Sequence, residues 1–219
     1  MKNSKSTRAQ SSRVGSVLLK IGGLGHFLGF ASWVAWGVLA VLSFEGILVY
    51  NGDFQWMSGV FFQASSSRLI FYGLLSLSLL FSGIGCFALL RKQKSGLGFV
   101  SGIVFIGTFV SVIPYVLSFV ALQSYAAYTF SLFPLFFLLA LILWGATLLS
   151  IAGNIGVSGL SRAAGVLFIA SGTFGMLLWQ VILYWGFEFW VFGVGWLYAV
   201  GALMSALIFF KISRMVEKP

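Results

Sequence analysis

Residues 21–29 read IGGLGHFLG, and they open an apolar stretch that continues to about residue 43. Within these nine residues the one polar side chain is His26, the single histidine of the chain, which stands among four glycines. A helix needs about 20 mostly apolar residues to cross the hydrocarbon core of a bilayer. The stretch is long enough, so it predicts a membrane-spanning helix that carries a histidine.

Five further apolar stretches follow, at about 69–90, 97–121, 133–152, 163–184 and 191–211. Hydrophobic residues make up 60% of the 219 residues and charged residues only 8%, and the mean hydropathy is +1.04. These values lie far outside the range of soluble globular domains. The fold class that we predict is all-α, a polytopic bundle of six transmembrane helices.

The distribution of charge predicts the orientation of this bundle. If the amino terminus is cytoplasmic, all thirteen basic residues except Arg68 fall inside, whereas Glu45, Asp53 and Glu188 fall outside. Cytoplasmic loops of membrane proteins carry such an excess of Lys and Arg. We therefore expect a basic cytoplasmic tail at 1–20, a six-span domain at 21–211 and a cytoplasmic tail at 212–219.

The net charge of +9 has the same explanation. Basic residues beside a membrane orient the chain and attract anionic lipid headgroups. A chain that consists almost entirely of spans has no fold left for reading nucleic acid bases. Membrane lipids are therefore the partners that we expect for these charges, and nucleic acid is not.

The longest connection, residues 43–68, combines polar residues such as Asp53 with aromatic residues such as Trp56. It is too polar for an easy span, and exposed backbone cannot lie unpaired in hydrocarbon. We expect an amphipathic segment at the outer interface, or a re-entrant loop that the bundle shields, between the first two spans.

A weak repeat links the third and fifth spans. GIVFIGTF begins at Gly102, and GVLFIASGTF begins at Gly165, 63 residues later, while GSVLLKIGG at Gly15 is a looser counterpart in the first span. Two readings stay open: three helical hairpins that all enter from the cytoplasmic side, or a chance recurrence of common membrane residues.

The glycines around His26 predict a packing face. Helical spacing places Gly22, His26 and Gly29 on one side of the first span, with Gly25 beside them. Small residues at such spacing let a second helix approach closely. We expect His26 to face protein, roughly 9 Å deeper than Lys20, and to donate or accept a hydrogen bond across the interface.

An ionisable residue inside a membrane is also a functional candidate, so His26 is the cofactor-binding residue that we consider. No acid or base lies in the middle of any predicted span, and one histidine cannot supply both axial imidazoles of a membrane haem. The alternatives to packing are a contact with a bound lipid or quinone and, less favoured, metal or haem ligation. We predict no other cofactor and no metal site.

Four charged residues, Glu45, Asp53, Arg68 and Glu188, are expected on the outer side. They either converge into a small site for an ion or a partner, or they are solvated loop charges. One histidine, one cysteine and four dispersed acids cannot assemble a catalytic constellation. The chain alone is therefore not expected to be an enzyme.

The predicted midplane is nearly all Gly, Ala, Leu, Val, Ile and Phe, whereas transporters place polar groups and broken helices there. This depletion favours a non-catalytic accessory or structural subunit of a larger membrane complex, such as an energy-converting assembly, with other transmembrane subunits as partners. A small-solute transporter is the alternative. We expect the plasma membrane as the location, with an organelle membrane as the alternative.

Overall fold

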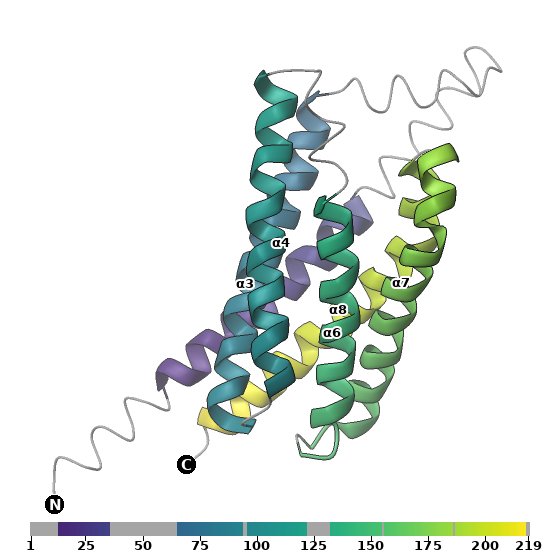
Figure 1. The fold of residues 1–219 in the computed structure, drawn as a ribbon. Helices are drawn as coiled ribbons and strands as arrows, with labels where there is room; N and C mark the ends of the chain where they lie inside the picture. Colours follow the sequence, from purple (N-terminus) through teal and green to yellow (C-terminus); the bar gives the residue numbers. More distant parts are fainter. Residues whose placement is uncertain are drawn as a thin grey trace, which may run out of the picture.

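Helices account for nearly all of the residues that the structure describes. The computed structural model describes residues 13–35, 65–93, 96–121, 132–154, 156–185 and 187–217. They form an N-terminal helix, Arg13–Ala35, and then α3 (Ser65–Gln93), α4 (Gly96–Ala121), α6 (Leu132–Ile151), α7 (Ser158–Trp185) and α8 (Phe187–Glu217) (Figure 1). For these residues the prediction of an all-helical fold is confirmed.

Five of these helices are long and apolar enough to cross a membrane: the N-terminal helix, α3, α4, α7 and α8. The apolar stretch of α6, Leu135–Ile151, is shorter than those of the other five. The rest of so small a chain could not shield several helices of this length and apolar composition from water, whereas a bilayer can. The chain is a membrane protein.

The helices extend beyond the apolar stretches at the basic end of the bundle. The N-terminal helix is already present at Arg13, the first described residue, instead of near residue 21, and α8 continues past residue 211 to Glu217. Leu19 and Ile212 are buried within these extensions, so apolar side chains still pack there between the charged ones. The connection predicted to be interfacial or re-entrant falls largely on residues 43–64, which lie outside the described residues.

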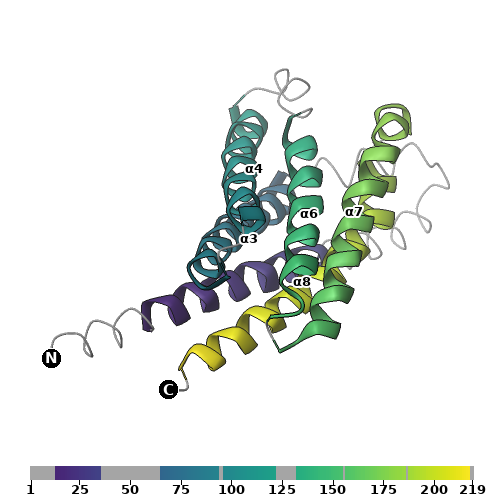
Figure 2. The ribbon, with the colours of Figure 1, turned by 60° about the horizontal axis from the view of Figure 1, so that its bottom comes forward.

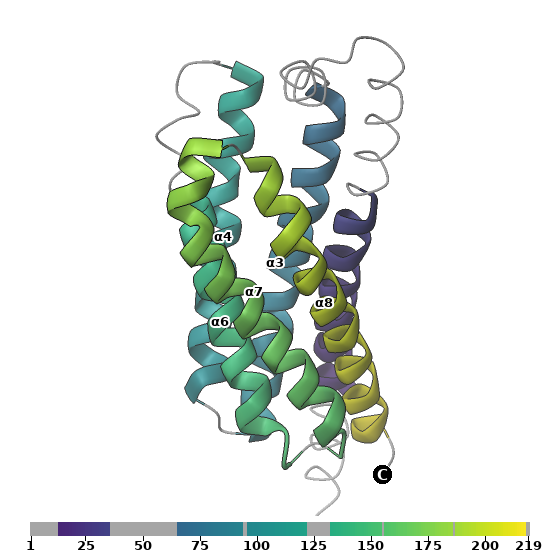
Figure 3. The ribbon, with the colours of Figure 1, turned by 90° about the vertical axis from the view of Figure 1, so that its right-hand side faces the viewer.

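The helices pack in chain order around a common centre. Contacts join α3 to α4, α4 to α6, α6 to α7 and α7 to α8. The N-terminal helix lies between α3 and α8, and together with α8 it crosses the bundle obliquely (Figures 2 and 3). Each helix therefore touches its two neighbours, and the six described helices close into a ring.

The first contact of this ring depends on glycines. A Cβ atom added to Gly22 would lie 2.6 Å from the Cα of Gly85 in α3, a distance that real side chains do not tolerate. Gly25 lies equally close to the backbone at Ser82, and Gly29 lies against Ser78. Close backbone approach brings many atoms into van der Waals contact, the main attraction between helices in lipid.

A second glycine contact joins α6 to α7. A Cβ on Gly145 would lie 2.6 Å from the carbonyl oxygen of Gly165, and a Cβ on Gly172 would lie 2.8 Å from that of Leu138. The two helices therefore pack backbone to backbone over several turns. Glycine is required at these positions because any larger residue would separate the helices.

Substitution of a contact glycine should therefore destabilise the fold more than substitution of an open one in the same helix. We expect Gly85→Ala to lower the free energy of unfolding by about 1–3 kcal/mol, because the added methyl meets the Gly22 backbone. Gly73→Ala, also in α3, has nothing within 4 Å of its new Cβ. It should be neutral or stabilising by up to about 1 kcal/mol. Reversible unfolding in mixed micelles measures both, and equal effects would contradict the packing.

Candidate functional site

His26 lies at the centre of the ring, with 1% of its surface exposed. Its imidazole is surrounded by four aromatic side chains, each from a different helix, which we call the aromatic cage: Phe105 of α4, Trp144 of α6, Phe168 of α7 and Phe209 of α8. The centroid of the imidazole lies 5.2 Å from that of the Trp144 ring and 5.4 Å from that of the Phe209 ring, and both rings stack on the imidazole. One side chain thus contacts four of the other five described helices.

The glycine face explains how His26 reaches this position. Gly22 and Gly25 bring the N-terminal helix against α3, and Gly22 and Gly23 also lie against Phe209 and Phe210 of α8. With its flanks so closely packed, the helix turns the imidazole of His26 toward the remaining helices. The structure thus places the predicted packing residues Gly22, Gly25, His26 and Gly29 on buried surfaces of the same helix.

Two members of the cage stand at matching positions of the weak repeat. Phe105 follows Gly102 by three residues, as Phe168 follows Gly165, and both phenylalanines contact the imidazole of His26. The three-hairpin repeat itself stays a prediction. Trp144 and Phe209 carry no such signal, since each is one aromatic residue among many in an apolar helix, and sequence reasoning missed them.

The hydrogen bond expected at His26 is not present at Nε2. This atom is fully buried and has no hydrogen-bond partner among the described residues. The side chains around the imidazole are aromatic rings. The one ring nitrogen among them, Nε1 of Trp144, does not bond to His26, because it donates to Ser205 Oγ at 3.2 Å. His26 therefore contributes ring packing at this site, and its polar Nε2 is left unsatisfied, which normally costs stability.

Several interior hydroxyl groups contrast with this histidine. Ser101 and Thr147 share a hydrogen bond of 2.8 Å between α4 and α6. Ser161 Oγ donates to the carbonyl of Leu148 at 2.7 Å, and Ser171 Oγ donates to that of Val194 at 3.1 Å. These small hydroxyl groups connect neighbouring helices and are themselves hydrogen-bonded, whereas Nε2 of His26 has no partner among the described residues.

The predicted outer site is not brought together by the described residues. Glu45 and Asp53 lie outside them, and so do the side chains of Arg68 and Glu188. Cys86 is a free, buried cysteine in α3. Within the described part of the chain, no group of three or more His, Cys, Asp or Glu side chains is placed to hold a metal ion.

A polar cluster that sequence reasoning missed joins the first and last helices. Lys20 Nζ forms a salt bridge of 2.6 Å with Glu217 Oε1, and Ser16 Oγ donates to the same oxygen at 2.7 Å. The side chains of Lys20 and Glu217 are about half exposed, so solvent screens this ion pair and it adds little to stability. The main effect of the ion pair is on position, because it holds the start of the N-terminal helix against the end of α8. The available signal was Glu217 itself, the one acid among many basic residues on the predicted inner side.

Fold and site together define a polytopic helical membrane protein with an aromatic centre built around one histidine. Neither the sequence nor the fold of this chain matches a protein-family model, a curated protein or a solved structure.

If His26 acts through packing, its ring matters more than its nitrogen atoms. His26→Phe should preserve the stacking and remove the unsatisfied Nε2, so stability should be unchanged or increased by up to about 3 kcal/mol. His26→Ala should lower the free energy of unfolding by about 3–5 kcal/mol, because it leaves a cavity among four aromatic rings. Unfolding in mixed micelles compares the two variants. A loss as large for His26→Phe as for His26→Ala would show that the imidazole makes a specific polar interaction.

Proposed function

We propose that this chain is a six-span, non-catalytic accessory or structural subunit of a larger complex in the plasma membrane, with both termini in the cytoplasm. The observation that carries the proposal is the centre of the ring. It is filled by His26 and the aromatic cage, and no Asp, Glu, Lys or Arg side chain is buried in the described part. A closed, packed centre supports a protein that holds neighbours in place.

The six spans are supported by the length and position of α6. It contains 20 residues, about 30 Å at 1.5 Å per residue, which matches the hydrocarbon thickness of a typical bilayer. It also packs between two helices that are long enough to span, α4 and α7. A sixth helix in this place gives an even number of crossings.

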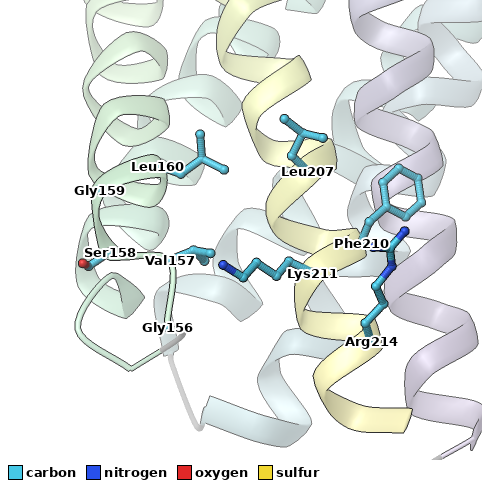
Figure 4. A pocket seen from close by; sticks show the side chains of 9 residues that line it. All are labelled: Gly156, Val157, Ser158, Gly159, Leu160, Leu207, Phe210, Lys211 and Arg214. Carbon is cyan, nitrogen blue, oxygen red and sulfur yellow. The ribbon is translucent and has the colours of Figure 1, made fainter. Parts of the chain in front are cut away.

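The orientation is supported by the end of the bundle at which the basic residues lie. Lys20 meets Glu217, so the start of the first helix and the end of the last lie together. The turn between α6 and α7 is at the same end, near Lys211 (Figure 4). This clustering of basic residues is what the positive-inside tendency requires of a cytoplasmic face.

The outer surface supports contact with lipids and with other transmembrane helices. Large apolar side chains are exposed along α4 and α7, the most exposed being Leu177 at 68%. Lipid chains and partner helices can both cover such surfaces. In this role the chain itself catalyses no reaction. The bound molecules that we expect are lipids or quinones.

A small-solute transporter is the second candidate, and one observation favours it. The unsatisfied Nε2 of His26 is a polar group near the centre of a helical bundle, where transporters bind their substrates. Transport would require the aromatic cage to separate so that a solute could reach the imidazole. The stacking of Trp144 and Phe209 on that ring opposes such an opening.

The proposed topology can be tested with single cysteines in a Cys86→Ser background. Gln93→Cys and Ser158→Cys should react with a membrane-impermeant maleimide only after the membrane is opened, because both are expected on the cytoplasmic side. Asp53→Cys should react in intact cells. Labelling of position 93 from outside would contradict the orientation.

The proposed role can be tested by extracting the chain with its surrounding bilayer into nanodiscs and determining the mass of the particles. We expect other membrane subunits to be recovered with it in a defined ratio. The matched measurement uses the purified chain in liposomes, which should show no solute flux above that of empty vesicles. A lone protein that catalyses flux would replace the accessory role by transport.

A further inference from the structure

A cavity lies at the basic end of the bundle, between the beginning of α7 and the end of α8 (Figure 4). Its volume is about 650 Å³. Residues 156–160 line one side, and Leu207, Phe210, Lys211 and Arg214 line the other. We call this cavity the α7–α8 groove. It shares no lining residue with the aromatic cage.

The charge of the groove is positive. Lys211 extends from α8 toward the turn at Val157, whereas the side chain of Arg214 leaves the other side of α8 and extends toward the N-terminal helix (Figure 4). Neither side chain forms a salt bridge with a carboxylate among the described residues, where the one ion pair is that of Lys20 with Glu217. Lys211 is therefore available to an anion in the groove, whereas Arg214 also acts electrostatically on the Glu217 carboxylate.

The backbone adds to this charge. Gly156 has a φ of 63°, a conformation that glycine adopts without strain, and it turns the chain into α7. The amide of Ser161 is bonded to the carbonyl of Val157 at 3.0 Å, whereas the amides of the first turn have no acceptor within the helix. A helix begins with a partial positive charge, so this wall of the groove also favours an anion.

The remaining walls are apolar. Leu160, Leu207 and Phe210 line the groove, and Leu207 is 52% exposed. Leu207 precedes Lys211 by four residues, which places it roughly 6 Å farther along the helix axis, toward the membrane interior. A molecule in the groove thus meets cations at one end and an apolar surface at the other.

We propose that the α7–α8 groove binds an anionic phospholipid from the leaflet on the basic side. The headgroup phosphate lies between Lys211 and the first turn of α7, and an acyl chain follows Leu207 toward the hydrocarbon. The inference does not depend on the accessory role, because a transporter with this groove would bind the same lipid.

The test is native mass spectrometry of the full chain, released from micelles that contain either phosphatidylglycerol or phosphatidylcholine. We expect one phosphatidylglycerol molecule to stay bound and phosphatidylcholine to dissociate. A Lys211→Gln variant should bind phosphatidylglycerol roughly fivefold more weakly, since each basic residue at a membrane surface contributes about fivefold. Arg162→Gln is the matched control, because Arg162 is exposed at the same end but does not line the groove.

A second variant tests the groove without changing its charge. Gly159 lines the groove and has nothing within 4 Å of an added Cβ, so Gly159→Trp should fold normally and obstruct the lipid. Equal retention of the two lipids, a loss as large for Arg162→Gln as for Lys211→Gln, or undiminished binding by Gly159→Trp would overturn the proposal. Complete displacement of the lipid by inorganic phosphate would also overturn it, since the acyl chain would then contribute nothing.

Discussion

The close approach of the N-terminal helix to α3 is the contact on which the rest of the structure depends. Gly22 and Gly85 meet backbone to backbone, so the two helices approach more closely than any side chain at either position would allow. In a bilayer the lipid chains are as apolar as the helix surfaces, so association relies on van der Waals contact and not on exclusion of water. This contact fixes the rotation of the first helix about its axis. That rotation directs His26 to the centre.

The centre then connects the remaining helices. Stacked and edge-on aromatic pairs contribute about 0.5–1.5 kcal/mol each beyond their burial, and the imidazole of His26 forms such pairs with residues of α4, α6, α7 and α8. The interior hydroxyl groups reinforce the ring by bonding neighbouring helices, as Ser101 does with Thr147. Nε2 of His26 departs from this pattern, because it is buried and has no hydrogen-bond partner among the described residues.

The basic end of the bundle combines three roles in a few residues. Lys20 and Glu217 hold the first and last helices together, and the surrounding positive charge supports a cytoplasmic orientation. Lys211 and Arg214 line a groove whose walls change from charged to apolar over one turn of α8. In a soluble protein such unpaired cations would simply be solvated. At the surface of a membrane they lie where anionic headgroups are concentrated.

The sequence by itself determined that this chain is helical and belongs in a membrane, because hydrophobic length and composition are properties of single segments. It also located the glycine face of the first helix, since helical spacing is local. It missed the extension of the helices to Arg13 and Glu217, because the apolar residues between those charges are buried only by contact with another helix. It led us to expect a hydrogen bond for His26, because a buried polar group usually has one.

Only the tertiary structure decided that four aromatic rings from four helices surround the imidazole, and that Lys211 lies opposite the turn at Gly156. Residues so far apart in the chain are brought together by the way helices pack, and the periodicity of one segment carries no information about which side chains of another will meet it.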